Sequence, residues 1–535
     1  MIVSLQERPP GRPCPHARQT TPSEPVTTTM PTLLRVPLRT LVTALLAVSL
    51  ATTTSAQVHY HPGGSPWNQR ASSGPDAVVD GWYYNLGITG MRVQLMPDAP
   101  KHLLVKHVFD DTPASSAVRV GDVITGAGGA AFLTEHQNGY GMDKFGPKGP
   151  ILEFAIALEA CQSSEGKGRL QLTLLRAGKE REVGIRVGKK YGAFGEQFPT
   201  SCKKSDTIRE ELCDYLLDQQ RDNGSWGSPV HDLFAPLALL ASGEKRYAAA
   251  VEKNARFHAA NTGLTNDAQL VNWRYMAAGI VLSEYFLSTK EKWVIAELEE
   301  IYSFLLSSQY MDLAQVNPRV RESHPNAWPK NATDSHGGWG HNPGFEGYGP
   351  ISMLTGQGAL AFSLMARCGV EVDRARLDAA FDFLERGTGK NGYVWYEDQV
   401  AGNSNWADMG RTGAAGIANA MSPYGDKKYQ ERAEKHSTVI GRHPEVFPDT
   451  HGSPLMGMGF AALSAGLVEG SYRNLMDGNR WWFALAQCAD GSFYYQPNRD
   501  NAGYGANSRV AASAVSAFIL SIPLGSLQMT GAGEK

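Results

Sequence analysis

The sequence predicts a multidomain protein in which a small β-rich domain precedes an all-α toroid of the (α/α)6 type. Three observations lead to this fold class. The length of 535 residues allows roughly two to four domains. The apolar period is two up to about residue 190 and becomes 3.6 from Asp206 onward. The helical segments of the second region alternate between amphipathic helices and helices that are small and apolar all round.

Composition supports a folded protein and excludes several classes. Hydrophobic residues make up 42% and charged residues 19%, which is too apolar for a disordered chain. The formal net charge of −3 excludes a general polyanion-binding surface, so no nucleic-acid partner is expected. Glycine is abundant, with 57 residues against a typical share of about 7%. Since there is no collagen-like period, this glycine must lie in loops or between closely packed helices.

The N-terminal region has the pattern of an exported protein. Residues 1–56 form the expected presequence, with translation starting at Met30. Arg35 and Arg39 precede a short apolar run at 41–51, and small residues at 54–56 suit a cleavage site. We therefore expect a secreted or periplasmic protein with no membrane span in the mature chain. An uncleaved N-terminal anchor is the alternative.

The β-rich domain is expected at 81–190, between linkers at 57–80 and 191–205. Strand-like segments occupy 91–95, 102–109 and 169–175, where apolar residues alternate or run together at strand length. One amphipathic helix, from Ile151 to Cys161, lies between the second and third strands.

This region resembles a PDZ domain of the bacterial type. The match rests on Asp111-Thr112-Pro113-Ala114, on Val120-Gly121-Asp122-Val123-Ile124, and on the loop that contains Leu86, Gly87 and Ile88. In that family the backbone amides of the loop hold a peptide carboxylate, so the resemblance implies that these three residues bind a protein C-terminus. The alternative is a PDZ fold that packs on its neighbour and binds no free peptide.

The toroid is expected at 206–527, followed by a tail at 528–535. Short connections lead from inner to outer helices, whereas most connections from outer to inner helices are long. These long loops must lie on one face, where binding chemistry usually sits. The twelve predicted helices occupy 207–219, 230–242, 245–260, 267–288, 291–308, 351–367, 372–386, 410–421, 426–440, 453–468, 471–487 and 508–521.

Loop motifs carry a second resemblance. The segment from Gln220 through Gly224 to Trp226 fits the Q-x-x-x-G-x-W repeat of triterpene cyclases and protein prenyltransferases, and the segment from Gln487 to Phe493 fits the same frame. We expect the glutamine to end the outer helix, the glycine to turn, and the aromatic ring to pack on the neighbour. The cyclising acid and the zinc set of those families are missing. The whole arrangement resembles an uncharacterised family of secreted bacterial proteins, which implies architecture but no reaction.

The long-loop face gathers aromatic and titratable residues, which suits a carbohydrate-like ligand. Acid–base catalysis needs a group that titrates near neutrality, for which His341 or His451 is suited, and Tyr348 is an alternative base. Arg411 is a cation in an apolar helix that needs Asp408 or Glu397 as partner. Helix N-capping is the structural alternative for Asp408. No cofactor or metal is expected. The candidate catalytic residues are His341, Tyr348, Asp408, Arg411 and His451.

Three functions fit these residues. The first is an enzyme that cleaves a polysaccharide, either by hydrolysis with two carboxylates from Asp232, Asp408 and Asp449, or by elimination with Tyr348 or His341 as base and Arg411 against a uronate. The second is a non-enzymatic scaffold that captures peptides. The third is a terpene-handling toroid with a dry aromatic cavity.

The cysteines add one open question, whether Cys202 and Cys213 are bridged.

Overall fold

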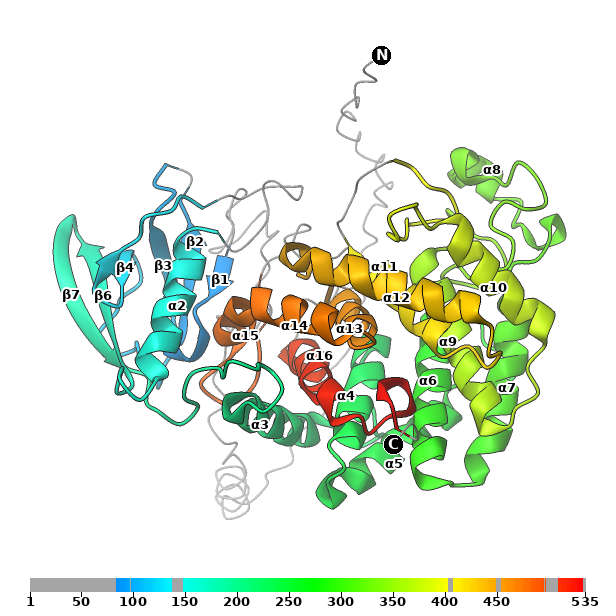
Figure 1. The fold of residues 1–535 in the computed structure, drawn as a ribbon, viewed down its shortest axis with the longest axis horizontal. Coiled ribbons are helices and arrows are strands. Elements are labelled where there is room, and N and C mark those ends of the chain that lie inside the picture. The colour runs from blue at the N-terminus through cyan, green and yellow to red at the C-terminus, as the bar shows by residue number, and fades with distance from the viewer. Residues whose placement is uncertain are drawn as a thin grey trace, which may run out of the picture. The chain divides into compact units, whose positions relative to one another are not determined.

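The computed structural model describes residues 83–96, 98–136, 148–402, 408–448, 454–494, 496 and 509–532. All of them belong to the unit Val58–Lys535. An antiparallel sheet comes first and a ring of helices follows (Figure 1). The predicted signal peptide and its start at Met30 lie outside the described residues.

The sheet is antiparallel throughout, with strand order β1-β2-β3-β4-β6-β7 and a short β5 paired to β4. Helix α2, Pro150–Gln162, packs Ile151, Phe154 and Leu158 into the core beneath β4 and β6. The predicted helix and three strands are confirmed to within a residue. The strands are β1 Tyr83–Asn85, β2 Met91–Leu95, β3 Leu103–Val108, β4 Val123–Ala127, β5 Ala130–Ala131, β6 Arg169–Arg176 and β7 Lys179–Arg186.

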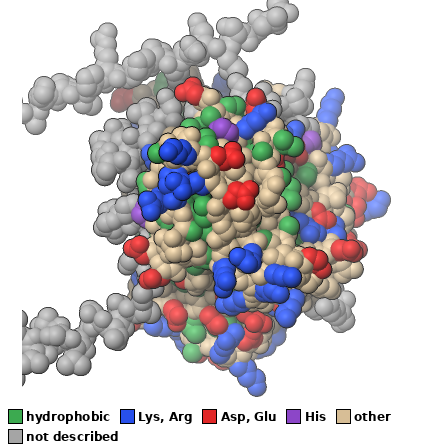
Figure 2. Space-filling model, turned by 90° about the vertical axis from the view of Figure 1, so that its left-hand side faces the viewer, with side chains coloured by type: hydrophobic (Ala, Val, Ile, Leu, Met, Phe, Trp, Pro, Cys, Tyr) green, Lys and Arg blue, Asp and Glu red, His purple; other side chains and the backbone are tan. Residues whose placement is uncertain are grey.

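Strand β7 was missed because it lacks an apolar alternation. Seven of its eight residues are at least partly exposed, and most are charged. Figure 2 views the side on which β7 lies in Figure 1 and shows acidic and basic side chains interspersed there. Charges on an edge strand discourage pairing with another chain. The sheet and its helix are established, whereas their PDZ-like identity stays a prediction.

Six inner helices form a closed ring. Each contacts the next in chain order, and α16 contacts α4 to complete the circle. Their glycines explain the close approach: a Cβ on Gly410 would lie 2.3 Å from the Cα of Gly457, and one on Gly413 would lie 2.4 Å from the backbone of Phe460. Part of the glycine excess is therefore a packing requirement. The inner helices are α4 Pro229–Ala241, α6 Val271–Thr289, α9 Ser352–Cys368, α11 Met409–Ala420, α13 Pro454–Ala465 and α16 Arg509–Ser521.

The outer helices alternate with the inner ones along the chain, as predicted. The last predicted outer helix is divided into α14 and α15 at Asn479, whose side-chain amide donates to the carbonyls of Leu475 and Pro444. The others are single. Their bounds are α3 Lys203–Gln219, α5 Ala248–Ala260, α7 Trp293–Ser308, α10 Arg374–Arg386, α12 Lys427–Arg442, α14 Glu469–Gly478 and α15 Arg480–Ala486.

One turn recurs in the connections from outer helices to inner helices. Its glycine has a φ of +92° at Gly224, +87° at Gly337, +92° at Gly392 and +84° at Gly491, a conformation that disfavours other residues. The side-chain amide of Gln220 donates to the carbonyls of Gly224 and, on the next outer helix, Ala250. The glutamine therefore ties its own turn to the neighbouring helix, a contact that the sequence analysis had assigned to the aromatic residue.

The edge strand β1 is joined to the toroid by a side chain that imitates a neighbouring strand. The Asn85 amide donates to Gln496 Oε1 at 3.0 Å, and Gln496 Nε2 donates to the Asn85 carbonyl at 2.9 Å. The Asn85 side chain also donates to the carbonyl of Leu485 in α15. Both backbone groups that this edge position offers are thus already paired.

The predicted carboxylate-binding loop is covered in this structure. Leu86 and Ile88 are buried, and the Leu86 amide donates to the carbonyl of Met91 within the sheet. Gly87 lies so close to α15 that a Cβ there would be 2.5 Å from the Ala484 carbonyl oxygen. Carboxylate binding by these residues stays a prediction and requires the loop to be uncovered, because the packing matches the alternative without a free peptide.

Two further expectations concern the whole described region. Cys161, Cys202, Cys213, Cys368 and Cys488 are all buried and free, so Cys202 and Cys213 are not bridged. Among the described residues, no helix has both the length and the hydropathy that a membrane crossing needs.

Candidate active site

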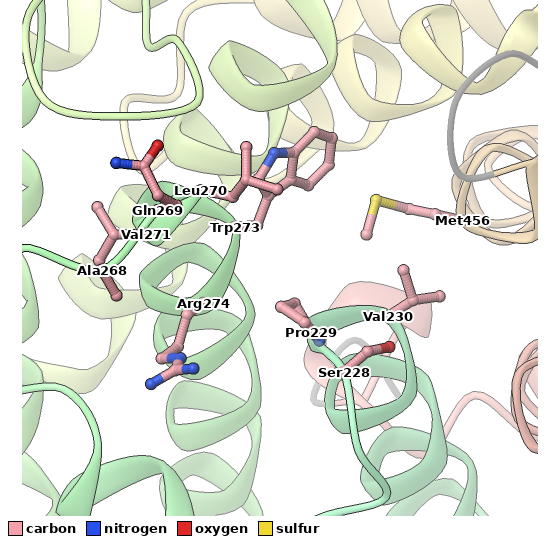
Figure 3. A pocket seen from close by; sticks show the side chains of 10 residues that line it. All are labelled: Ser228, Pro229, Val230, Ala268, Gln269, Leu270, Val271, Trp273, Arg274 and Met456. Atoms are coloured by element: carbon pink, nitrogen blue, oxygen red, sulfur yellow. The ribbon is translucent and has the colours of Figure 1, made fainter. Parts of the chain in front are cut away.

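The long-loop face carries a pocket near the starts of three inner helices. Its cavity of about 280 Å³ lies between the first turns of α4 and α6 and Met456 of α13. Figure 3 shows Pro229, Val230 and Met456 facing Leu270 and Trp273 across the opening. The wall is mostly apolar, and Arg274 brings a cation to it. The pocket therefore suits a ligand with both an apolar face and a polar substituent.

Trp273 begins a chain of side chains that leads away from the pocket. Its indole Nε1 donates to His341 Nδ1 at 2.8 Å, and His341 Nε2 lies 2.6 Å from the Tyr348 hydroxyl. The Tyr396 hydroxyl donates to that same Tyr348 oxygen at 3.2 Å. Two predicted residues, His341 and Tyr348, are thus in direct contact, and the chain connects them to the pocket wall.

The partners of His341 determine its tautomer. An indole nitrogen only donates, so Nδ1 must accept and the proton of the neutral ring sits on Nε2. His341 Nε2–H then donates to Tyr348. Burial lowers the pKa of His341, which favours this neutral form. Both nitrogens are therefore engaged inside the protein, and His341 holds the Tyr348 hydroxyl by a hydrogen bond.

Tyr348 is the most exposed member of the chain. Its hydroxyl oxygen accepts from His341 and from Tyr396, and its side chain is 37% exposed. The Tyr348 hydroxyl is therefore held by two neighbouring side chains at the exposed end of the chain.

Buried amides hold the His341 loop in place. The Asn272 backbone donates to the His341 carbonyl at 3.2 Å, and the Asn272 side chain donates to Gly340 at 2.8 Å. Asn342 Oδ1 accepts from the amide of Leu270, which forms part of the pocket wall. The pocket and the loop that carries His341 are therefore one connected structure.

Arg411 lies beneath the other end of this chain. Its guanidinium donates to the Tyr393 hydroxyl at 2.7 Å and stands 5.4 Å from the centroid of the Tyr396 ring. It pairs with Asp408 at 3.8 Å, which is one of the two partners that the sequence predicts. With 7% exposure, Arg411 supports the tyrosines from within the protein.

The capping explanation of Asp408 is wrong. Asp408 occupies the N-cap position of α11, but its side chain accepts no hydrogen bond from the first turn. It is 3% exposed, has a left-handed φ of +60°, and its Oδ1 has no hydrogen-bond partner within the described part of the chain. A non-glycine residue held in this conformation with a buried, half-satisfied carboxylate is typical of functional positions.

Burial and neighbouring groups shift the pKa values of Arg411 and Tyr396. Burial alone would lower the pKa of Arg411, but Asp408 and the two tyrosines outweigh it and raise the pKa. Burial, followed by the contact with Tyr348, raises the pKa of Tyr396 well above its ordinary range. Tyr396 therefore stays protonated and keeps its hydrogen bond to Tyr348. Tyr396 is not among the residues predicted from the sequence; the signal that marks it is its position in a long loop directly after Trp395.

Asp232 has a structural role. Its carboxylate accepts from the Trp226 amide at 2.6 Å and from the Ser225 hydroxyl at 2.7 Å. Equivalent bonds join the residue two positions after each recurring glycine to the start of the next inner helix. These bonds run from the Trp339 amide to Thr355, from Val394 to Thr412, and from Phe493 to Ser513. Asp232 is therefore a member of this repeated set, which argues against its use as a catalytic carboxylate.

The remaining candidates are not assembled with the Tyr348 chain. Asp449 and His451 lie outside the described residues. His324 approaches Tyr348 only edge to face, with ring centroids 6.1 Å apart, and His443 pairs with Glu445. In the regions the structure describes, no three His, Cys, Asp or Glu side chains gather closely enough to hold a metal ion.

The closed inner ring, the alternating outer helices and the loop-borne site define an α/α toroid with its candidate chemistry on one face. Residues 205–531 match the family described as a domain of unknown function (DUF6288), which is more than half of the chain. The protein belongs to that family. No curated protein matches the chain.

Several solved toroids are similar at low identity. An α-1,6-mannanase, GH76A of Salegentibacter sp. HEL1_6, has a TM-score of 0.43 at 12% identity, over 60% of this chain and 99% of that one. A glycosyl hydrolase of family 88 from Bacteroides vulgatus has a TM-score of 0.40 at 13% identity, over 59% and 98%. A cellobiose 2-epimerase from Bacillus thermoamylovorans has a TM-score of 0.39 at 11% identity, over 58% and 98%. At TM-scores below 0.5, these likenesses say nothing about substrate or reaction.

Proposed function

We propose that this protein is a glycan-cleaving enzyme whose active site lies on the long-loop face of the toroid, and that it works by β-elimination. The observation that carries the proposal is Tyr348, an exposed tyrosine whose hydroxyl accepts hydrogen bonds from His341 and Tyr396. Its neighbour in the chain, Trp273, lines a pocket with an apolar wall. A sugar ring presents apolar C–H faces and polar edges, which this combination accommodates.

Elimination fits the described residues better than hydrolysis does. Hydrolysis of a glycosidic bond needs two facing carboxylates. Asp232 is used in the fold, and Asp408 is buried against Arg411. Elimination instead needs one group that takes a proton and returns it, which a tyrosine hydroxyl in this environment can do.

The reaction balances without a further reactant. The ionised Tyr348 oxygen takes the proton from C5 of a uronate residue. The electron pair of the broken C5–H bond forms a double bond between C4 and C5, and the bond from C4 to the glycosidic oxygen breaks. Tyr348 then returns its proton to the leaving oxygen. His341 and Tyr396 stabilise the tyrosine oxygen while it is charged.

The test is a screen of uronate polysaccharides for new ultraviolet absorbance from the double bond. Tyr348→Phe removes the proton carrier, and we expect kcat to fall by about 10²–10⁴-fold. Tyr424→Phe is the matched control, because Tyr424 follows the C-terminal end of α11 on the opposite face. Full activity in Tyr348→Phe, or the absence of unsaturated product from every uronate polymer, would contradict the proposal.

A further inference from the structure

Elimination from a uronate requires a cation near the acid group, and the predicted cation is poorly placed for it. Arg411 is 7% exposed and is occupied by Tyr393 and Asp408. Its contacts place it against the inner side of Tyr396. The acidic group of a substrate must therefore meet a different positive charge.

Arg274 is the cation that the pocket offers. It follows Trp273 in the first turn of α6, and both residues line the cavity. Arg274 is half-buried, and within the described ranges it has neither an ion pair nor a hydrogen bond. Figure 3 shows Trp273 and Arg274 leaving the same end of α6 in different directions, with the indole ring toward Met456 and the guanidinium directed away from Pro229.

An arginine in such a wall is suited to one class of ligand group. The guanidinium is always charged and offers paired donors that match the two oxygens of a carboxylate. Partial burial reduces screening by water, so such a contact is stronger than one on an open surface. Apart from Ser228 and Gln269, the remaining wall is apolar and includes Pro229, Val230, Leu270, Trp273 and Met456.

We infer that this pocket is a subsite for one uronic acid unit of an acidic polysaccharide, with its ring against Trp273 and its carboxylate on Arg274. The volume of about 280 Å³ is near the lower end for ligand pockets and suits a single sugar unit. The inference rests on the proposed function and names its substrate class. The bond from Trp273 to His341 connects this subsite to Tyr348.

Binding can be measured without turnover, by affinity electrophoresis of the full chain in gels that contain alginate, pectate or hyaluronan. We expect retardation by at least one of them and none by its carboxyl-reduced form. Arg274→Gln should weaken binding by about tenfold or more, and Arg274→Lys by less, because lysine keeps the charge but loses the paired donors. Arg181→Gln, on the exposed strand β7, changes the net charge equally and should bind like the wild type.

A second variant keeps the test independent of folding. Gln269 is an exposed member of the pocket wall, so Gln269→Glu adds a repelling charge without disturbing the core. It should weaken uronate binding as well. Equal binding of native and carboxyl-reduced polymers, wild-type binding by Arg274→Gln, binding of sulfated polymers alone, or no binding at all would each overturn the inference.

The outcomes separate the subsite from the reaction. Uronate binding that depends on Arg274, together with an absence of unsaturated product, would retain the subsite and remove the proposed elimination. Product formation that depends on Tyr348 but not on Arg274 would retain the proposed elimination and remove the subsite.

Discussion

At the scale of single residues, the candidate site depends on which atom donates and which atom accepts in each hydrogen bond. Trp273 determines the tautomer of His341, and that tautomer makes His341 a donor to Tyr348. The same indole ring forms part of the pocket wall. One side chain therefore connects ligand contact with the state of the proposed proton carrier.

Replacing Trp273 should change the titration of His341. In Trp273→Phe the indole N–H is lost and Nδ1 becomes free to take a proton, so the pKa of His341 should rise from its lowered value toward about 6.5. A lowered histidine pKa makes the folded protein lose stability as the pH falls below 6.5, because the unfolded chain binds the proton first. That loss should be smaller in the variant.

The measurement is an NMR titration of the His341 ring. Trp328→Phe is the control, since Trp328 lies in the same long loop and packs with a separate cluster around Tyr310 and Phe345. If the pKa of His341 is the same in Trp273→Phe and in wild type, the indole does not control its protonation.

At the scale of elements, the toroid is held by a turn that repeats with the same contacts. The Gly224 carbonyl accepts from Asn254 of α5, and the Gly392 carbonyl accepts from His436 of α12. Asn254 and His436 thus make the same kind of hydrogen bond at equivalent turns. Burial lowers the pKa of His436 to about 4, so it remains a neutral donor over the physiological range.

The glycine of this turn should be intolerant of any side chain. At Gly224, with a φ of +92°, a Cβ would lie 2.4 Å from the Lys253 carbonyl oxygen. Gly243, with a φ of +69°, has nothing within 4 Å and provides a matched control. We expect Gly243→Ala to lower the free energy of unfolding by about 1 kcal/mol through backbone strain alone.

Gly224→Ala adds a steric clash to the same strain, so it should cost about 1–3 kcal/mol more. Urea denaturation of the two variants measures the difference. Equal losses would show that the turn does not press against the neighbouring helix.

At the scale of the whole chain, the sheet and the toroid share buried contacts across long sequence separations. Gln496 and Asn85 are 411 residues apart and exchange two backbone-like hydrogen bonds. Lys204 of α3 contacts Glu159 and Gln162 of α2 and is itself buried. The sheet is therefore built into the toroid, and its edge at β1 is already occupied.

Removing the Gln496 side chain should open that edge selectively. In Gln496→Ala the Asn85 amide loses its acceptor, so its hydrogen exchange should accelerate by about tenfold or more. Amides between β6 and β7, which pair only within the sheet, should exchange as in wild type and provide the internal control. Unchanged exchange at Asn85 would mean that the sheet edge is protected by something else.

The helix spans, their alternation and the turn glycines were predictable, because apolar period and left-handed φ are local properties that the residue types themselves express. Only the tertiary structure decided which side chains meet. His341 and Trp273 are 68 residues apart, and the loops that bring them together have no periodic signal. The buried, uncapped Asp408, the structural use of Asp232 and the covered loop at Gly87 follow from packing between distant segments, which no local pattern encodes.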